Sequence, residues 1–390
     1  MNLCELRWQD PLTYTYLGSP SLVRLPGGRL IATHDYFGPG CPRNHEDEEH
    51  LTSVYRSDDN GRTWLNVTHI ANAYWSTLFV HQGALYLLGC SQQFGSIVIR
   101  RSDDEGRTWT HPRDEHSGLL FRGGPFHAPP NYSGAPVPIQ CSKGRLYRAF
   151  EDTDPYVWGC GFQACVISVP EEADLLEAAN WLMSNKLPFD PAWLPPAWGK
   201  LVNPGWLEGN IVETPEGNLW NILRFHSDPL ASKAAIVQVH DNGKRVSFNP
   251  ANGFINFPGG MSKFTIRWDP VSHLYWTLIN PVTKELPPTT PFDLYVATDV
   301  PQINPFPRNV LALYVSNDLR TWRAYKDLIV DDSGLSEEKS SAQVGFQYAD
   351  WQFDGDDIIY LVRTAYGGAH NFHDSNRITF HRLPNFRDLI

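Results

Sequence analysis

The segment from Tyr366 to Arg377 carries a dense set of side chains that could do acid–base chemistry. It brings Tyr366, His370 and His373 close together along the chain, with two glycines between the tyrosine and the first histidine. Imidazole and phenol groups exchange protons near neutral pH, and glycine permits close backbone approach to a ligand. We therefore expect a loop that faces a reaction site. A metal site at His370, His373 and Asp374 is less well supported, because no further ligand follows at a suitable spacing.

Other ionisable side chains recur at two kinds of position, the start of one predicted strand and the end of the next. If the strands form units around a ring, both positions lie on one rim and face the centre. They are more polar than a packed core requires. The positions are Gly18 and Ser19, His34 and Asp35, 43–50, Trp75, His127, Glu151 and Asp152, Glu208 and Asn210, Arg224 and His226, Lys263, Tyr348 and Asp350, Arg363 and Tyr366, and His370 and His373. We expect Glu208, Arg224, Tyr348 and Arg363 to converge on one site.

An internal repeat indicates the elements that position these side chains. Ser57–Trp64 recurs 45 residues later as Ser102–Trp109, and a degenerate copy spans Ser316–Trp322. Before the first copy, the pattern reads as strand, turn, strand, loop and strand, which is one four-stranded propeller blade. The same pattern begins five further units, at 74–102, 133–168, 210–248, 263–315 and 347–381. Residues 3–8 are expected to close the ring, a helix is expected at 171–184 as an insertion in blade three, and residues 1–390 form one domain.

The repeated Ser-x-Asp-x-Gly-x-Thr-Trp octapeptide resembles the Asp-box, or BNR repeat, of the sialidase-like β-propellers. This resemblance implies an all-β fold, a six-bladed β-propeller of four-stranded antiparallel blades. The repeat itself is structural: the aspartate accepts backbone N–H groups, the glycine supplies a positive φ, and the tryptophan packs between sheets. It indicates the fold and not a reaction.

The resemblance to sialidases extends to single residues, and it is partial. Glu208 and Arg224 resemble the family's glutamate and second carboxylate-binding arginine, and Tyr348 resembles its nucleophile. Arg43 and Asp47 are the nearest matches to its basic residue and its acid/base aspartate. The chain departs from the family where Gly18-Ser19-Pro20 replaces the first arginine, where Lys263 replaces the third, and where Arg363 replaces a glutamate. Lysine lacks the bidentate fork that suits a carboxylate, so recognition of sialic acid itself is doubtful.

These residues lead to a hypothesis of an exo-acting glycoside hydrolase, with an acidic sugar such as a uronic acid or a sialic acid analogue as one candidate substrate. Tyr348 would be the nucleophile activated by Glu208, Asp47 the general acid/base, and Asp350 the alternative carboxylate. Arg224, Lys263 and Arg363 would bind an anion. The other substrate-binding candidates are His34, Asp35, Arg43, His226, Tyr366, His370 and His373.

Two alternatives stay open. A polysaccharide lyase would abstract the proton beside a uronate carboxylate with a histidine or tyrosine. A propeller that binds carbohydrate without catalysis would use aromatic residues such as Trp75, Phe126, Trp158 and Trp206 for stacking.

Composition narrows the choice of partners. The 32 Lys and Arg against 43 Asp and Glu leave a formal charge of −11, which disfavours nucleic acid and anionic membranes. We expect a carbohydrate partner and neither a cofactor nor a metal, and the oligomeric state is open. No apolar run has the length of a membrane span, and residues 1–9 carry no secretory apolar run, so a cytoplasmic location is expected. The six cysteines are expected to be free buried thiols.

Overall fold

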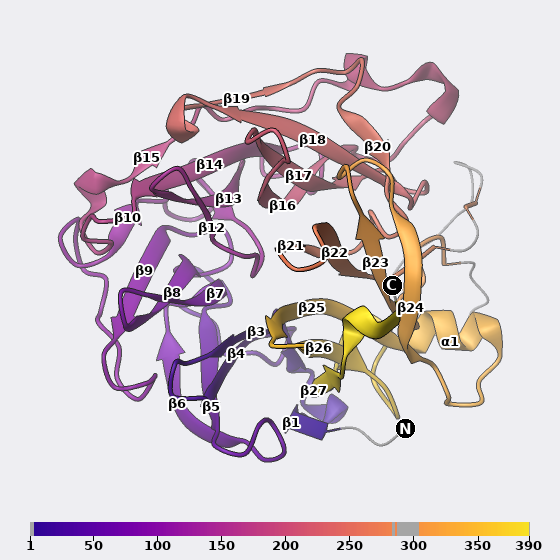
Figure 1. Ribbon diagram of the computed structural model, residues 1–390, viewed down its shortest axis with the longest axis horizontal. Coiled ribbons are helices and arrows are strands. Elements are labelled where there is room, and N and C mark those ends of the chain that lie inside the picture. The colour runs from indigo at the N-terminus through magenta and orange to yellow at the C-terminus, as the bar shows by residue number, and fades with distance from the viewer. Residues whose placement is uncertain (1–3, 283–284, 287–303, 390) are drawn as a thin grey trace.

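Six antiparallel β-sheets stand around a central axis in the computed structural model (Figure 1). The structure describes residues 4–282, 285–286 and 304–389. The sheets confirm the predicted all-β, six-bladed propeller. In the expected fifth blade, residues 283–284 and 287–303 lie outside the described residues. No helix in the described ranges is long and apolar enough to cross a membrane.

The strands follow the chain around the ring. Blade one contains β2 (Tyr16–Leu17), β3 (Ser21–Arg24), β4 (Leu30–Phe37), β5 (Leu51–Ser57) and β6 (Leu65–Ala71). Blade two contains β7 (Tyr74–His81), β8 (Ala84–Cys90), β9 (Ile97–Ser102) and β10 (Leu119–Phe121). Blade three contains β11 (Tyr132–Ser133), β12 (Gln140–Ser142), β13 (Arg145–Thr153), β14 (Phe162–Pro170) and β15 (Leu182–Met183). Blade four contains β16 (Gly205–Glu213), β17 (Leu219–His226), β18 (Lys233–His240), β19 (Arg245–Phe248) and β20 (Phe254–Asn256). Blade five contains β21 (Thr265–Asp269), β22 (Leu274–Ile279), β23 (Val310–Ser316) and β24 (Arg323–Val330). Blade six contains β25 (Gly345–Asp354), β26 (Asp357–Ala365), β27 (Arg377–Leu383) and the N-terminal β1 (Cys4–Trp8).

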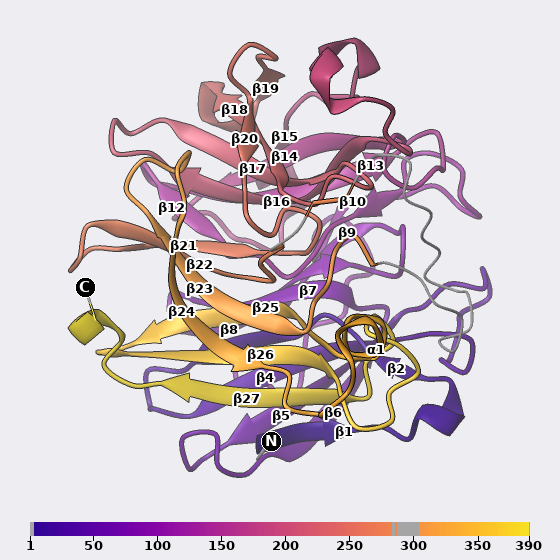
Figure 2. The ribbon, with the colours of Figure 1, turned by 90° about the vertical axis from the view of Figure 1, so that its right-hand side faces the viewer.

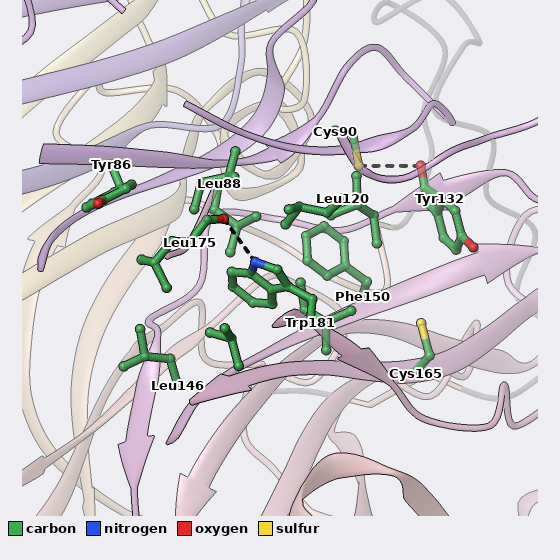
Figure 3. Packing of buried hydrophobic residues seen from close by; sticks show 14 of the residues in the cluster. Tyr86, Leu88, Cys90, Leu120, Tyr132, Leu146, Phe150, Cys165, Leu175 and Trp181 are labelled. Carbon is green, nitrogen blue, oxygen red and sulfur yellow. Dashed lines mark hydrogen bonds between the residues drawn. The ribbon is translucent and has the colours of Figure 1, made fainter. Parts of the chain in front are cut away.

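Burial explains the sequence of each strand. The second strand of each blade is covered on both faces because neighbouring blades pack face to face. Strand β26 is therefore buried at every position after Asp357, and it reads as an apolar run from Ile358 to Val362. The outer strand β6 is mostly exposed or half-buried, and it carries polar side chains. Figure 3 shows the core between blades two and three, where Phe150 and Trp181 pack and the indole N–H of Trp181 donates to the carbonyl of Leu175 at 3.0 Å.

The ring closes through the N-terminus. Strand β1 lies beside β27 in both views (Figures 1 and 2), with Cys4 opposite Phe380 and Trp8 opposite Arg377. This pairing confirms the predicted closure, with Leu3 outside the described residues, and it covers the edge that β27 would otherwise expose.

The repeated octapeptide forms the same turn in its two full copies. In the first, Asp59 accepts from the Thr63 backbone N–H at 2.9 Å, and the indole of Trp64 donates to the carbonyl of Gly61 at 3.1 Å. The second copy repeats both bonds through Asp104 and Trp109. The glycine of each copy has a φ of 86°. The degenerate copy keeps the bonds of its aspartate and tryptophan, with Leu319 at a φ of 62°.

The helix predicted at 171–184 is wrong. This segment forms turns, the 3₁₀ helix Ala178–Asn180 and the strand β15. Leu175 and Trp181 both enter the core between blades two and three, and their six-residue spacing does not match one face of an α-helix. The only α-helix among the described residues is α1 (Glu337–Gln343), in the connection that leads into blade six. The other 3₁₀ helices are Pro11–Thr13, Pro191–Trp193, Pro196–Trp198, Asp241–Gly243 and Phe386–Leu389.

The cysteines only partly follow the expectation. All six are free thiols, and Cys41, Cys90 and Cys165 are buried. Cys141 and Cys160 are exposed, which corrects the expectation that all of them are buried.

Candidate active site

Three inner strands share a bulge that turns a side chain out of the regular alternation. The pairing register shifts at Tyr74/Thr77 in β7, at Leu207/Asn210 in β16 and at Gln347/Asp350 in β25. Inside these bulges, Trp75, Glu208 and Tyr348 have left-handed φ values of 47°, 47° and 54°. This conformation is costly for residues other than glycine, and bulges of this kind re-aim side chains beside functional sites. The bulges thus mark equivalent positions on blades two, four and six.

Glu208 and Tyr348, near the start of their inner strands, form a closed hydrogen-bonded group with Arg224, which lies near the end of β17. The Tyr348 hydroxyl donates to Glu208 Oε1 at 2.5 Å, and Arg224 Nη1 donates to Glu208 Oε2 at 2.9 Å and to the Tyr348 hydroxyl oxygen at 3.1 Å. Arg363 places its guanidinium over the Tyr348 ring, 4.9 Å from the centroid. The four side chains expected to converge therefore lie together, and all four are buried.

The electrostatics of this group keep the tyrosine protonated at rest. Burial raises the pKa of Tyr348, the negative charge of Glu208 raises it further, and Arg224, Arg308 and Arg363 oppose both effects. A neutral phenol therefore donates to a carboxylate. The tyrosine can become a nucleophile only as its proton moves to Glu208 along the existing hydrogen bond.

Arg308 is a site residue that the sequence analysis missed. It is buried in the loop that precedes β23, where Nη1 donates to Gln347 Oε1 and Nη2 donates to the Met261 carbonyl at 3.2 Å. Burial, together with the charges of Arg224 and Arg363, lowers the pKa of Arg308 to about 9. Three guanidinium groups thus surround Tyr348. The loop after a second strand was already a position of interest, so the same positional rule identifies Arg308.

Lys263 lies on the inner side of blade five and has a different partner. Its ammonium donates to the Ala349 carbonyl at 2.9 Å, and burial lowers its pKa to about 8 against the charges of Asp350 and Glu208. Asp350 accepts from the Ser21 hydroxyl at 3.0 Å and from the Leu22 N–H at 2.8 Å. It therefore connects blade six to blade one.

A second buried carboxyl stands beside Glu208. Glu151 in β13 accepts the Gly209 N–H at 3.2 Å, and it is almost completely buried. Burial and the charge of Glu208 raise the pKa of Glu151 to about 8. At neutral pH Glu151 therefore holds its proton.

Two buried acids of blade one, Asp35 and Glu49, lie within the electrostatic reach of Arg363. Asp35 accepts from the Thr52 hydroxyl at 2.7 Å and from the Trp75 N–H at 2.9 Å. Burial raises the pKa of Asp35 to about 7, against these hydrogen bonds and the charge of Arg363. Glu49 accepts from the Tyr74 hydroxyl at 2.6 Å, and burial raises its pKa against the charges of Arg43 and Arg363. Arg363 therefore lies between the tyrosine group and the acids of blade one.

In the acidic loop of blade one, the side chains that point inward are not the one expected from the family resemblance, Asp47. The Asp47 side chain is 89% exposed and lies 3.8 Å from Arg43 Nε, whereas Glu48 and Glu49 point inward. Asp47 also has a left-handed φ of 60°, which turns it outward at the tip of the loop. His34 lies in the core of blade one, 3.1 Å from the Tyr55 hydroxyl, because β4 alternates and Asp35 takes the opposite face.

The histidines divide into two groups. His226 is two residues beyond Arg224, and burial and that arginine lower its pKa to about 4. His370 Nδ1 and His373 Nδ1 lie 2.7 Å and 2.9 Å from the two carboxylate oxygens of Asp374. Burial and the charge of Arg363 lower the pKa of His373 to about 4, so it is a neutral base. Tyr366 turns away from these residues, and its hydroxyl donates to Asp332 at 2.7 Å.

Comparison with known proteins was made by sequence and by structure. No protein-family model and no curated protein matches the sequence. Among solved structures, an α-L-arabinanase of Penicillium chrysogenum complexed with arabinobiose is similar at a TM-score of 0.56 and 15% identity, over 100% of this chain and 99% of that chain. An α-L-arabinofuranosidase of Fusarium graminearum, complexed with an iminosugar inhibitor, has a TM-score of 0.59 at 13% identity over 99% and 98%. A Hadza microbial sialidase is similar at a TM-score of 0.58 and 14% identity, over 96% of this chain and 66% of that chain.

The chain shares the six-bladed β-propeller fold of these structures. At this level of identity the likeness establishes the fold alone, and the solved structures named here are glycoside hydrolases. Any more specific activity has to be argued from the side chains of this chain.

Proposed function

We propose that this protein is an exo-acting glycoside hydrolase whose substrate sugar carries an anionic group near the anomeric carbon. The observation that carries the proposal is the hydrogen-bonded group of Tyr348, Glu208 and Arg224, with Arg308 and Arg363 around it. The glycosidase neighbours of the fold support the reaction class, since several were solved with sugars or sugar analogues bound.

Three guanidinium groups favour an anionic substrate. The Nε–H groups of Arg224 and Arg308 are buried, and within the described chain they have no hydrogen-bond partner. Buried donors are rarely left unpaired, and a carboxylate or a similar oxyanion can accept from several of them at once. An anion beside the anomeric carbon would repel a carboxylate nucleophile, so a neutral phenol is the better attacking group.

The proposed reaction has two steps. In the first, the Tyr348 proton moves to Glu208 as the phenolic oxygen forms a bond to the anomeric carbon, and the bond from that carbon to the leaving oxygen breaks. An acid protonates the leaving oxygen. In the second step, water attacks the anomeric carbon and gives its proton to that acid, while Glu208 returns the first proton to the departing tyrosine.

We propose Asp35 as this acid. Its pKa of about 7, raised by burial, allows it to hold a proton at neutral pH and to lose it during turnover. Asp47, the acid expected from the family resemblance, has a solvent-directed side chain and no comparable burial. The assignment to Asp35 is measurable, because it predicts that activity falls as pH rises through about 7.

A uronate lyase is the second candidate, and it rests on His373. Because Asp374 is a carboxylate, it accepts from Nδ1 of His373, which leaves Nε2 free of that contact as a base. The charge of Arg363 lowers the pKa of both His373 and Asp374, so the guanidinium lies near this pair. In this reaction, Arg363 would hold the uronate carboxylate while His373 removes the adjacent C5 proton. The electron pair of that bond forms a C4–C5 double bond as the bond from C4 to the glycosidic oxygen breaks, and the leaving oxygen takes up a proton.

A substrate panel separates these candidates. The protein is incubated with aryl glycosides of sialic acid, glucuronic acid, galacturonic acid, arabinose and galactose, and with uronate oligosaccharides. Release of the phenol with a saturated sugar, strongest for an acidic glycoside, supports the proposal. An unsaturated uronate product, detected by its ultraviolet absorbance, would assign the lyase instead. Hydrolysis of neutral glycosides only would overturn the anionic substrate, and no turnover on any member would favour a binding protein.

A further inference from the structure

Two loops on the rim of blades two and three expose an unusual number of aromatic side chains. Phe126 lies in the loop between β10 and β11, and Tyr156 and Trp158 lie in the loop between β13 and β14. Their exposed fractions are 64%, 42% and 46%. The ring of His127 stacks on Tyr156, with centroids 4.0 Å apart and planes 10° from parallel. We call these four residues the aromatic platform. Exposed aromatic groups of this kind mark binding surfaces more often than ordinary surface.

The platform is continuous with the candidate active site. Tyr156 packs against Phe94 at 4.9 Å, and Phe94 packs against Trp75, the bulge residue of blade two, at 5.5 Å. Phe94 also belongs to a small buried cluster with Leu207, the neighbour of Glu208. The platform loop continues to blade four, where a Cβ built on Gly159 would lie 3.2 Å from the His226 ring. The platform and the tyrosine group therefore occupy neighbouring parts of one rim.

Polar groups border the platform and give it the mixed character of a carbohydrate site. His127 Nε2 contacts Glu48 Oε1. Burial raises the pKa of Tyr156, and the charge of the nearby Glu48 raises it further. On the other side of the loop, Gln92 donates to Glu46 at 2.8 Å, and the Phe126 N–H points to the same carboxylate. Sugars bind through aromatic faces together with such acceptors and donors.

The charge of the two halves of the rim differs. Arg224, Arg308 and Arg363 stand around Tyr348. Three carboxylates, Glu46, Glu48 and Glu49, border the platform, with Arg43 as a cationic partner 3.2 Å from Glu49. An anionic sugar fits the first half, and carboxylates beside the platform would repel a second anion.

We propose that the aromatic platform is the subsite for the leaving-group side of the substrate, and that it takes an uncharged sugar ring. This assignment rests on the proposed function, because the leaving group is defined by cleavage at Tyr348. Its occupant is a neutral glycan joined to the acidic sugar that the arginines hold.

The test compares two substrates with different leaving groups. One is the disaccharide of the hydrolysed acidic sugar linked to galactose, and the other is the fluoride of the same acidic sugar, which lacks a leaving-group ring. In Trp158→Ala and Phe126→Ala, the ratio of kcat/KM for the disaccharide to that for the fluoride is expected to fall about tenfold, as expected for loss of one aromatic contact. Trp268→Ala removes a tryptophan of blade five that is 39% exposed, close to the 46% of Trp158, and the ratio should not change. An unchanged ratio in both platform variants would overturn the proposal.

A binding measurement keeps the platform testable if no substrate is hydrolysed. Titration calorimetry of the whole protein with lactose and xylotriose should show heat that is lost in Trp158→Ala and retained in Trp268→Ala. That result without any turnover would retain the platform and reject the hydrolase. Normal hydrolysis with no neutral-sugar binding and no change of ratio would reject the platform and retain the hydrolase.

Discussion

Tyr348→Phe is the substitution that most specifically removes the proposed nucleophile. It deletes one oxygen, which donates to Glu208 at 2.5 Å and accepts from Arg224 at 3.1 Å. The ring remains under the Arg363 guanidinium, so no cavity opens, and Arg224 still holds the other oxygen of Glu208. Loss of these bonds in a buried site should cost about 1–3 kcal/mol. For a chain of this length that corresponds to a Tm lower by about 1–4 °C.

The activity loss should be much larger than this stability loss. A phenyl ring cannot form the bond to the anomeric carbon, so kcat/KM should fall by roughly a thousandfold or more. The assay is release of the phenol from the best aryl glycoside of the panel, with Tm followed by scanning fluorimetry.

Tyr275→Phe is the matched control for this substitution. It removes a hydroxyl that donates to the Glu213 carbonyl at 2.6 Å in blade five, and its activity should be retained. If Tyr348→Phe keeps turnover within about tenfold of the parent while its Tm falls as calculated, the reasoning about Tyr348 is refuted.

Three further predictions follow from charges in the site. Arg308→Gln should raise KM for the acidic glycoside about tenfold or more, since a charge-assisted contact to the anion is lost; equal KM for both proteins would remove Arg308 from the site. The kcat/KM of the parent should fall as pH rises through about 7, where Asp35 loses its proton. This fall should disappear in Asp35→Asn and remain in Asp47→Asn. If the fall near pH 7 remains in Asp35→Asn, Asp35 is not the acid. Because burial raises the folded-state pKa of Glu151 to about 8, its contribution to stability is present at low pH and is lost as pH rises from its ordinary value toward 8. Between pH 5 and pH 8, the Tm of Glu151→Gln should therefore decrease less than the Tm of the parent. Parallel Tm profiles for the two proteins would contradict the raised pKa of Glu151.

The architecture could be predicted from the sequence because its signals are local and repeated. The turn of Ser57–Trp64 uses side chains within a few residues of one another, so its sequence is enough to identify it. The closing strand β1 followed from counting the strands of the last blade. The helix at 171–184 failed for the opposite reason, because Leu175 and Trp181 are placed by contacts with blades two and three rather than by helical periodicity.

The site could be predicted only in part. Glu208, Arg224, Tyr348 and Arg363 were found because they occupy equivalent blade positions and because ring closure brings such positions together. Arg308 was missed because it lies far along the chain from the end of β22, although the positional rule covers the segment after a second strand, and Lys263 stood at the more regular position. Which of the adjacent acids from Asp47 to Glu49 turns inward depends on the left-handed φ of Asp47, which no neighbouring sequence signal specifies.

The central claim is that Tyr348 forms a covalent bond to the sugar, and trapping that intermediate tests it most directly. The protein is treated with the fluorinated fluoride of the acidic sugar identified by the panel, digested, and mapped by mass spectrometry. We predict a label on the peptide that contains Tyr348, absent in Tyr348→Phe and reduced in Glu208→Gln. A label on Glu151 or Glu208 instead would contradict the claim and place the covalent bond on a carboxylate.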